Sequence, residues 1–396
     1  MAGHATQLTY LDHAATTPLR PAARAAMLPW LGEQFGNPSG AHAVARAART
    51  AIDEARDVVA SVLGCAPNEV VFTGGGTEAD NLAVQGVVAA RPGPVVVTAV
   101  EHHAVLHPAD HVDSHTVGVD RRGVVDLDAL AATLQDRPDT TLVSVMAANN
   151  EVGAVQPIDE VGDLVRKLAP DATVHTDAVQ AAAWLDVAHV ADTADLISIS
   201  AHKFGGPQGA GVLVVRRGTA IRARNLGGGQ ERDLRSGTHN VAGIVGLAAA
   251  LEAKVARRDA EDARVTALRE RLADGLLAAI PDSWETAVPA ERDRSHLLPN
   301  IVHLTIAGVE SEALLFLLDE AGVCASAAAA CASGAQAASH VLAAMAVSPQ
   351  ASEGALRLSL GWPSTDADVD RALDVLPAAV TRLRSARRPS TVAVGR

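Results

Sequence analysis

Short apolar stretches alternate with longer segments of helical pattern between residues 69 and 216. The longer segments repeat apolar residues at helical spacing, for example over 77–90 and 158–168. Alternating strands and helices predict an α/β domain with a mostly parallel sheet that is covered on both faces. We place its seven strands at Val70–Thr73, Pro94–Ala99, Ser114–Val119, Thr140–Ala147, Thr173–Thr176, Leu196–Ser200 and Gly211–Val215.

The last two of these strands are joined differently from the others. The connection from 196–200 to 211–215 is too short for a helical crossover, so we expect this pair to be antiparallel. Earlier in the chain, the pattern over 41–63 predicts a long amphipathic helix, which is entered from 36–40.

The chain beyond residue 240 predicts a second and smaller layer of α+β type. One long helix over Val241–Ala278 leads into it. Strands are expected at 300–306 and 356–360, and helices at 311–320 and 366–383.

These elements divide the chain into two domains. The large domain is expected over residues 10–260 and the small domain over 261–387. Residues 1–35 are expected to pack with the small domain, and 388–396 to form a flexible tail.

Composition and charge argue against several classes of protein. The 396 residues are 48% apolar and 2% aromatic, and the net charge of -13 argues against nucleic-acid binding. No secretory leader and no membrane-spanning apolar run are present, so we expect a cytoplasmic protein. Three widely spaced cysteines, Cys65, Cys324 and Cys331, argue against a disulfide framework.

Lys203 stands directly after the strand 196–200 and before Gly205-Gly206-Pro207. A lysine at a strand end can lose its solvation, which lowers the pKa of its ammonium group and yields a nucleophilic amine. Enzymes bind pyridoxal phosphate (PLP) through a Schiff base to such a lysine. A surface lysine in a turn is the alternative interpretation.

Two further features lie at ends of strands in the same predicted sheet. The glycine-rich segment 73–78 follows a strand and opens a helix, so its amides could hold one phosphate, although glycines are common at such turns. Asp177 needs a cationic partner such as a protonated pyridine nitrogen, unless it only caps a helix. Because carboxyl ends of parallel strands meet at one edge, we expect these groups and Lys203 to converge.

A run of histidines raises the question of a metal. His103, His107 and His111 recur every four residues, which is the spacing of metal ligands on a helix. No HExxH pattern is present and Pro108 interrupts the helix, so we favour a solvated face and predict no metal site.

With these features the chain resembles the cysteine desulfurases of the NifS/IscS type, within the class V aminotransferase family. The resemblance runs from Tyr10 to about Arg384. It implies a PLP-dependent transferase of fold type I that forms a homodimer. The motifs that carry it are YLDHAATTP at 10–18, FGNPSG at 35–40, VVFTGGGTEADNLA at 70–83, NNEVG at 149–153, HTDAVQ at 175–180, SAHKFGGPQGAG at 200–211, GGGQERDLRSGT at 227–238 and LRLSLG at 356–361.

The resemblance also implies roles for single residues of the cofactor site. Lys203 would form the internal aldimine, Asp177 would pair with the pyridine nitrogen, and His102 would stack on the ring and move protons. Asn150 and Gln180 would hydrogen-bond near the phenolic oxygen of the ring. The phosphate contacts would come from Gly76, Thr77, Ser200, His202 and, in the other subunit, Thr238.

For the substrate, the resemblance implies that Asn37 and Arg357 bind the carboxylate of L-cysteine. Arginine suits this task because its two parallel N–H groups match a carboxylate. The products would be L-alanine and a persulfide whose sulfur passes to an acceptor protein. Iron–sulfur cluster assembly, thiolated tRNA and sulfur-containing metabolites are all open as uses of that sulfur.

Cys331 is the expected nucleophile of the reaction. It lies in a run of Ala, Ser and Gly that predicts a mobile loop, and the following Ser339-His340-Val341-Leu342 matches the family. A small buried hydrophobe is the alternative. The chain departs from the family at Ala328, Ala329 and 336–338. A selenocysteine lyase or another related PLP enzyme, or a non-catalytic sulfur-transfer scaffold, therefore stays open.

Overall fold

The structure is a computed structural model that describes residues 8–327 and 339–387. The described residues form two compact units. The chain crosses between them several times, so neither unit is one continuous stretch of sequence. The larger unit holds residues 15–150 and 154–262, and the smaller unit holds 8–14, 151–153, 263–327 and 339–387.

The N-terminal segment is shared between the two units, whereas the sequence analysis assigned all of 1–35 to the small domain. Only the described residues up to Ala14 group with the smaller unit. The chain from Ala15 joins the larger unit because helix α1 (Pro21–Met27) packs on α8 (Val241–Val255). The predicted tail at 388–396 lies outside the described residues.

The larger unit is built on a seven-stranded sheet with the order β2-β8-β7-β6-β5-β3-β4. Four neighbouring pairs are parallel, and β8 is antiparallel to β7, as its short connection predicts, and also to β2. The predicted α/β fold is therefore confirmed. The strands are β2 (Val70–Thr73), β3 (Val95–Thr98), β4 (Ser114–Val117), β5 (Leu142–Ser144), β6 (Thr173–Asp177), β7 (Leu196–Ser200) and β8 (Gly211–Val215).

Strand β5 is shorter than the predicted 140–147. It ends at Ser144, yet the amides of Val145 and Ala147 still donate to carbonyl oxygens of β6. The chain therefore continues beside β6 after the regular ladder has ended. It carries the following asparagines along the carboxyl end of that strand.

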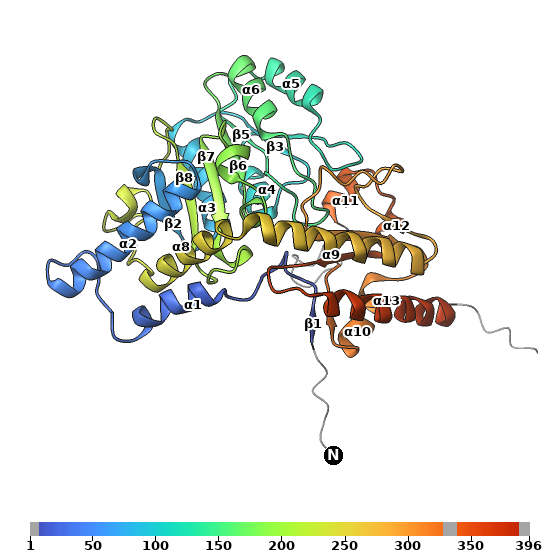
Figure 1. Ribbon diagram of the computed structural model, residues 1–396. Coiled ribbons are helices and arrows are strands. Elements are labelled where there is room, and N and C mark those ends of the chain that lie inside the picture. The colour runs from blue at the N-terminus through green and yellow to red at the C-terminus, as the bar shows by residue number, and fades with distance from the viewer. Residues whose placement is uncertain (1–7, 328–338, 388–396) are drawn as a thin grey trace, which may run out of the picture. The chain divides into compact units, whose positions relative to one another are not determined.

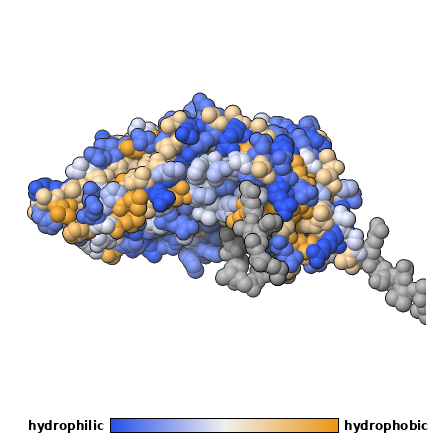
Figure 2. Space-filling model, turned by 60° about the horizontal axis from the view of Figure 1, so that its bottom comes forward, coloured by the Kyte–Doolittle hydropathy of each residue, from blue (hydrophilic) through white to orange (hydrophobic). Residues whose placement is uncertain are grey.

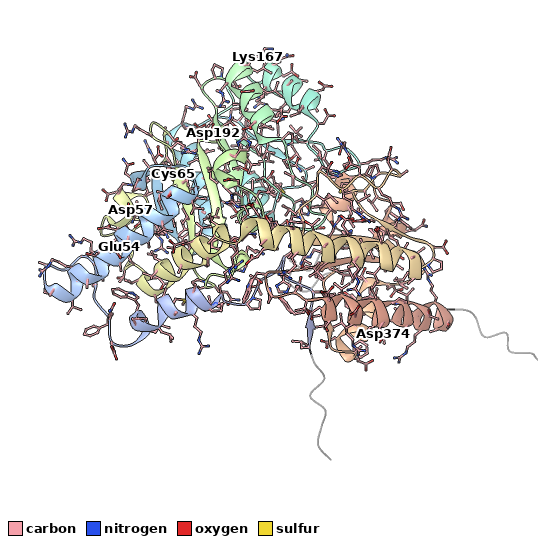
Figure 3. All side chains as sticks on the ribbon, viewed as in Figure 1. Glu54, Asp57, Cys65, Lys167, Asp192 and Asp374 are labelled. Atoms are coloured by element: carbon pink, nitrogen blue, oxygen red, sulfur yellow. The ribbon has the colours of Figure 1, made fainter. Side chains whose placement is uncertain are left out.

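Helices cover the sheet because their apolar faces pack on its strands. Helix α3 packs on β2 and on β5–β8, and Val71, Leu82 and Leu213 share one buried cluster there. Helix α2 buries Ile52 while Glu54 and Asp57 point to solvent (Figure 3). The helices of this unit besides α1 and α8 are α2 (Ala43–Val62), α3 (Gly76–Ala90), α4 (His103–Ala109), α5 (Leu127–Asp136), α6 (Ile158–Leu168) and α7 (Val187–Val190).

The single long helix predicted over 241–278 is wrong, because the chain forms two helices there. Helix α8 ends at Val255, and α9 runs from Arg258 to Ala279 (gold in Figure 1). At the break the amide of Arg257 bonds to the carbonyl oxygen of Lys254, three residues back, which tightens the turn. The apolar pattern of the two helices gave no signal for this break.

The smaller unit contains an antiparallel sheet of order β12-β10-β9 and a parallel pair of short strands, β1 and β11. Helices α10 and α13 pack together beside β11 (Figure 1). Among the described residues, no helix combines the length and apolar character needed to cross a bilayer. The elements are β1 (Thr9–Tyr10), β9 (Ser283–Glu285), β10 (Ile301–Ile306), α10 (Ser311–Glu320), β11 (Val323–Cys324), α11 (His340–Ala344), α12 (Pro349–Ser352), β12 (Ala355–Ser359) and α13 (Asp366–Arg387).

Candidate active site

Strands β2 and β7 flank β8, and both end level with its first residue, Gly211. Gly211 is in register with Thr73, the last residue of β2, and with Ser200, the last residue of β7. A Cβ atom on Gly211 would lie 2.7 Å from the Cα atom of Gly75, so only glycine lets the turn after β2 approach this closely. The turn and the end of β7 border a cavity of about 760 Å³. The residues that line it include Gly74, Gly75, Gly76, Thr77, Ser200 and His202.

The glycine turn is shaped to receive a small anion. Gly75 has a φ of +147°, which residues with a side chain rarely adopt, and α3 begins at the next residue. A Cβ atom on Gly76 would lie 2.7 Å from Cγ2 of Val179. The turn residues line the cavity, and the partial positive charge at the start of a 15-residue helix lies beside it. This arrangement fits the single phosphate group that the sequence predicted here.

Asp177 and Lys203 are electrostatically coupled at the same edge of the sheet. Asp177 is buried at the end of β6, and its Oδ1 accepts a hydrogen bond of 2.8 Å from the amide of Val179. Burial raises the pKa of Asp177 to about 6, while the Val179 amide and the charge of Lys203 offset part of the rise. The Nζ atom of Lys203 donates to the carbonyl oxygen of Ala15 at 2.8 Å.

His202 contributes a neutral ring to the cavity. Burial and, to a smaller extent, the neighbouring charge of Lys203 lower its pKa to about 4. The Nδ1 atom lies 3.2 Å from Oγ1 of Thr16. The ring therefore offers a hydrogen bond near neutral pH rather than a positive charge.

His102 follows β3 and caps the short helix α4. Its Nδ1 accepts a hydrogen bond of 3.1 Å from the amide of Ala104, so a proton on the neutral ring lies on Nε2. The preceding residue, Glu101, is fully buried, and burial raises its pKa to about 8 in spite of hydrogen bonds from Thr98 and Met146. The protonated form of Glu101 therefore persists at neutral pH.

A family model described as Aminotransferase class-V matches residues 9–372. The chain belongs to this family. It is 44% identical to an "IscS-like cysteine desulfurase" of Mycobacterium tuberculosis, over 98% of this chain and 99% of the relative. It is 42% identical to "Cysteine desulfurase IscS" of Dictyoglomus turgidum, over 95% of each chain.

Solved structures of NifS-like proteins have the same fold as this chain. A "NIFS-LIKE PROTEIN" superimposes with a TM-score of 0.87 at 35% identity, over 95% of this chain and all of the other. A "NifS-like protein" from Rickettsia africae superimposes with a TM-score of 0.86 at 29% identity, with the same coverage. The predicted resemblance to the NifS/IscS type and the predicted fold type I are therefore confirmed.

Of the expected site residues that the structure describes, Gly76, Thr77, Ser200 and His202 line the cavity, and the others, Lys203 and Asp177 among them, do not. Asn37 and Thr238 lie exposed on loops of the larger unit, and Asn37 accepts a hydrogen bond from the amide of Ser39. Arg357 lies on β12 in the smaller unit, where its Nη2 donates to Oδ1 of Asp12 at 2.8 Å. Cys331, the predicted nucleophile, lies outside the described residues.

The last two expected cofactor contacts follow strands that end at the same edge. Asn150 is half-buried after β5, and Gln180 is buried shortly after β6. Their roles toward a bound ring stay predictions. The positions nevertheless agree with the expectation that ligand groups gather at the carboxyl ends of the parallel strands.

A buried polar network lies near Asp177, and it was not predicted from the sequence. The ring of His175 contacts the hydroxyl groups of Ser144 and Ser198, at 2.8 and 3.0 Å. Its Nε2 lies 3.6 Å from Oδ1 of Asp80, a buried residue of α3. Burial and the nearby Asp177 raise the pKa of Asp80, which favours its protonated form. The signal was an acidic residue inside the apolar run of a helix.

The histidines that follow His102 form no metal centre in the structure. The rings of His103 and His107 lie 4.9 Å apart on α4, but the helix ends before His111. Across residues 8–327 and 339–387, no three His, Cys, Asp or Glu side chains are placed to hold a metal ion.

Proposed function

We infer that the chain is a PLP-dependent cysteine desulfurase. It converts L-cysteine to L-alanine, holds the released sulfur as a persulfide and passes it to an acceptor. The coupling of Asp177 with Lys203 beside a glycine turn carries this inference, because these are the groups that PLP requires. Relatives that are 42% to 44% identical over nearly the whole chain and are called cysteine desulfurases support it.

The residues present fit the cofactor at both of its charged ends. The phosphate would accept hydrogen bonds from the turn at Gly76 and Thr77 and from Ser200 and His202. Lys203 would hold the cofactor covalently through its amine. When bound, PLP supplies an electron-withdrawing ring that stabilises negative charge on the substrate carbon.

Other residues would act on protons and on the ring. Asp177 is an anion at pH values above about 6, and it would keep the pyridine nitrogen protonated. His102 is placed to move a proton through Nε2, because its Nδ1 is held by the Ala104 amide. Asn150 and Gln180 would hydrogen-bond the phenolic oxygen, and Asn37 and Arg357 would bind the substrate carboxylate.

We assign the sulfur-transfer step to Cys331. Its thiolate attacks the sulfur of the bound substrate, and a sulfur–sulfur bond forms. The carbon–sulfur bond of the substrate breaks, its electron pair stays on the carbon, and protonation of that carbon yields alanine. The persulfide then gives its outer sulfur to the thiol of an acceptor protein.

The experiment is persulfide formation from L-cysteine by the wild type and by Cys331→Ala. We expect the wild type to release alanine and to carry one extra sulfur, detected by mass spectrometry. We expect the variant to keep the visible absorbance of bound PLP but to lose the persulfide. A persulfide that forms equally in the variant would exclude the role of Cys331. Activity on selenocysteine alone would favour a lyase.

We propose that the protein works as a homodimer in the cytoplasm. Apolar side chains between α1 and α2 are exposed, with Phe35 at 80%, and Leu28 and Leu31 beside it in sequence. Figure 2 shows apolar patches on this end of the molecule. A second copy would cover them and would bring its Thr238 to the phosphate. A single-subunit mass in sedimentation analysis of the holoprotein would contradict this proposal.

A further inference from the structure

The segment Gly229–His239 has an unusual backbone. Glu231, Arg232 and Asp233 have φ values of 48°, 57° and 63°, so three consecutive residues with side chains adopt the left-handed conformation. Such residues usually occur singly, because the Cβ atom crowds the following carbonyl oxygen. Strained backbone persists only where surrounding contacts hold it, and it concentrates at functional sites. The contacts that hold this segment are therefore informative.

Glu231 holds the segment at one end. Its buried carboxylate accepts two hydrogen bonds from Arg56 of α2, at 2.7 and 2.9 Å, and lies 2.8 Å from Nε2 of His239. It also accepts a hydrogen bond of 2.8 Å from the amide of Phe72. Burial alone would raise the pKa of Glu231, but the bonds from His239, Arg56 and Phe72 outweigh it and lower the pKa to about 2.

The hydrogen bond from the Phe72 amide connects the Glu231 carboxylate to the cofactor site. Phe72 lies in β2, the edge strand of the sheet, and its outward amide has no neighbouring strand to pair with. The Glu231 carboxylate supplies that missing acceptor. Two residues later, β2 runs into the glycine turn at Gly74. The Glu231 carboxylate therefore holds in place the strand that leads into the glycine turn.

Arg235 holds the middle of the segment to helix α3. Its Nε and Nη2 donate to the two carboxylate oxygens of Glu78, at 2.7 and 3.2 Å. The same Oε2 of Glu78 accepts a hydrogen bond of 2.7 Å from the amide of Gly74. The strained segment is therefore tied at two points, Glu231 and Arg235, to the strand, turn and helix that border the cavity.

We propose that Glu231 is a positioning residue for the phosphate-binding turn, acting through the edge of β2, and that Arg235 supports it through Glu78. This inference rests on the proposed function, because it assumes that the turn receives the phosphate of PLP. Glu231 does not touch the cofactor. Its effect is to keep the amides of the turn in the geometry that the anion requires.

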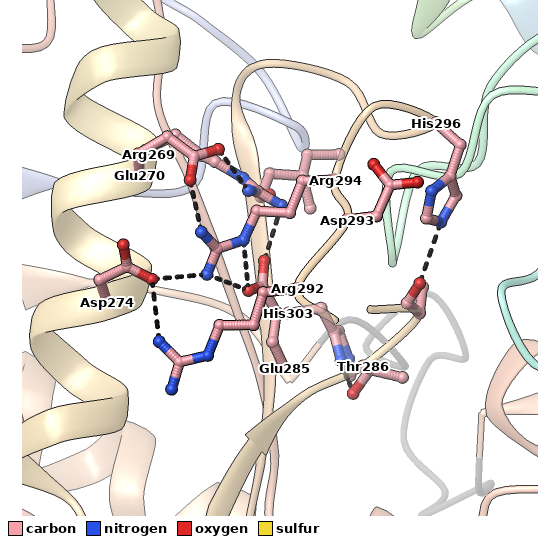
Figure 4. Close-up of polar contacts among 12 residues, drawn as sticks. Arg269, Glu270, Asp274, Glu285, Thr286, Arg292, Asp293, Arg294, His296 and His303 are labelled. Carbon is pink, nitrogen blue, oxygen red and sulfur yellow. Dashed lines mark hydrogen bonds and ion pairs between the residues drawn. The ribbon is translucent and has the colours of Figure 1, made fainter. Parts of the chain in front are cut away.

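The test compares Glu231→Gln with a matched control, Glu285→Gln. Glu285 of β9 is also a buried, arginine-bonded carboxylate, held by Arg269 and Arg294, but it lies in the smaller unit (Figure 4). Each apoprotein is titrated with PLP and with pyridoxal, which lacks the phosphate. Replacing a charged acceptor by a neutral amide should weaken PLP binding by about tenfold in Glu231→Gln. We expect pyridoxal binding to change little in any of the three proteins.

The ratio of the two affinities separates positioning from a general loss of stability. Equal weakening of PLP and pyridoxal by Glu231→Gln, or unchanged binding of both, overturns the inference. The same loss of PLP affinity in the Glu285→Gln control overturns it as well. Wild-type apoprotein that binds neither compound instead contradicts the proposed function itself.

A second variant keeps the test valid if Glu231→Gln does not fold. Arg235→Gln removes a partly exposed pair and leaves Glu231 in place. We expect a smaller loss of PLP affinity, about threefold, and again no change for pyridoxal. An unchanged PLP affinity in this variant, with its fold verified by circular dichroism, counts against the proposal.

Discussion

Two regions of this molecule bury acidic groups with different partners. At the carboxyl edge of the large sheet, Asp177 and Glu101 accept hydrogen bonds from amides and a hydroxyl group, and burial raises their pKa values to about 6 and about 8. In the smaller unit, Glu285 is bonded to the guanidinium groups of Arg269 and Arg294 (Figure 4). Arginine compensates a buried charge permanently. The first region instead keeps carboxyl groups whose charge a ligand can compensate.

The largest effect on activity should follow from removing the amine of Lys203. Lys203→Ala deletes the group that would hold PLP covalently, so we expect desulfurase activity to fall about ten-thousandfold or more. Reduction of the holoprotein with borohydride, followed by mass spectrometry, should label Lys203 in the wild type and nothing in the variant. A label on another lysine would contradict the assignment.

The next effect concerns the charge of Asp177. Asp177→Asn keeps the shape of the side chain but cannot stabilise a protonated pyridine nitrogen, so we expect activity to fall about a hundredfold or more. The measurement is kcat for alanine formation, together with the absorbance spectrum of the bound cofactor. Full activity would show that Asp177 is no partner of the ring.

A substitution in the arginine-bonded region around Glu285 should change the stability of the fold rather than the catalytic rate. Glu285→Ala removes the buried carboxylate that Arg269 and Arg294 share and leaves them the more exposed carboxylates of Glu270 and Asp274. The free energy of unfolding should fall by about 3–5 kcal/mol. Urea denaturation measures this change, and kcat of the folded variant should match the wild type. The exposed Glu54→Ala serves as the control and should change stability by less than about 0.5 kcal/mol.

The smallest effect is a pH dependence of the apoprotein. Burial raises the pKa of Asp177 from 3.8 to about 6, so the folded state holds its proton more tightly than the unfolded state. Its contribution to the free energy of unfolding therefore falls as the pH rises from about 4 to about 6, by about 1–3 kcal/mol. Asp177→Asn should lack this decline and should be the more stable apoprotein above pH 6. An identical pH profile for both proteins would rule out the raised pKa.

The sequence was sufficient for the parts of the site that depend on strand order. Lys203 and Asp177 each follow an apolar strand, and strands of a parallel sheet deliver such residues to one edge. The glycine turn was recognisable because it lies between a strand and a helix. The antiparallel end of the sheet followed from the length of one connection.

The parts that the sequence did not reveal depend on tertiary contacts. Asp80 and Glu101 are buried by elements distant in the chain, so their raised pKa values depend on the fold, even though an acidic residue within an apolar helix was visible at Asp80. The three left-handed residues that begin at Glu231 are not glycines, and a carboxylate bonded to Arg56 holds them in place. The break after Val255 separates two segments that both favour helix.

The pairing of Gly211 with both Thr73 and Ser200 has a consequence for how the protein can vary. Strands β2 and β7 end level with the first residue of β8 because of hydrogen bonds between the strands, not because of the lengths of the loops that join them. Insertions into the surface segment at 217–224 should leave the spacing of lysine, aspartate and glycine turn unchanged. Evolution can thus remodel the exterior of this unit while the distances that the chemistry depends on stay constant.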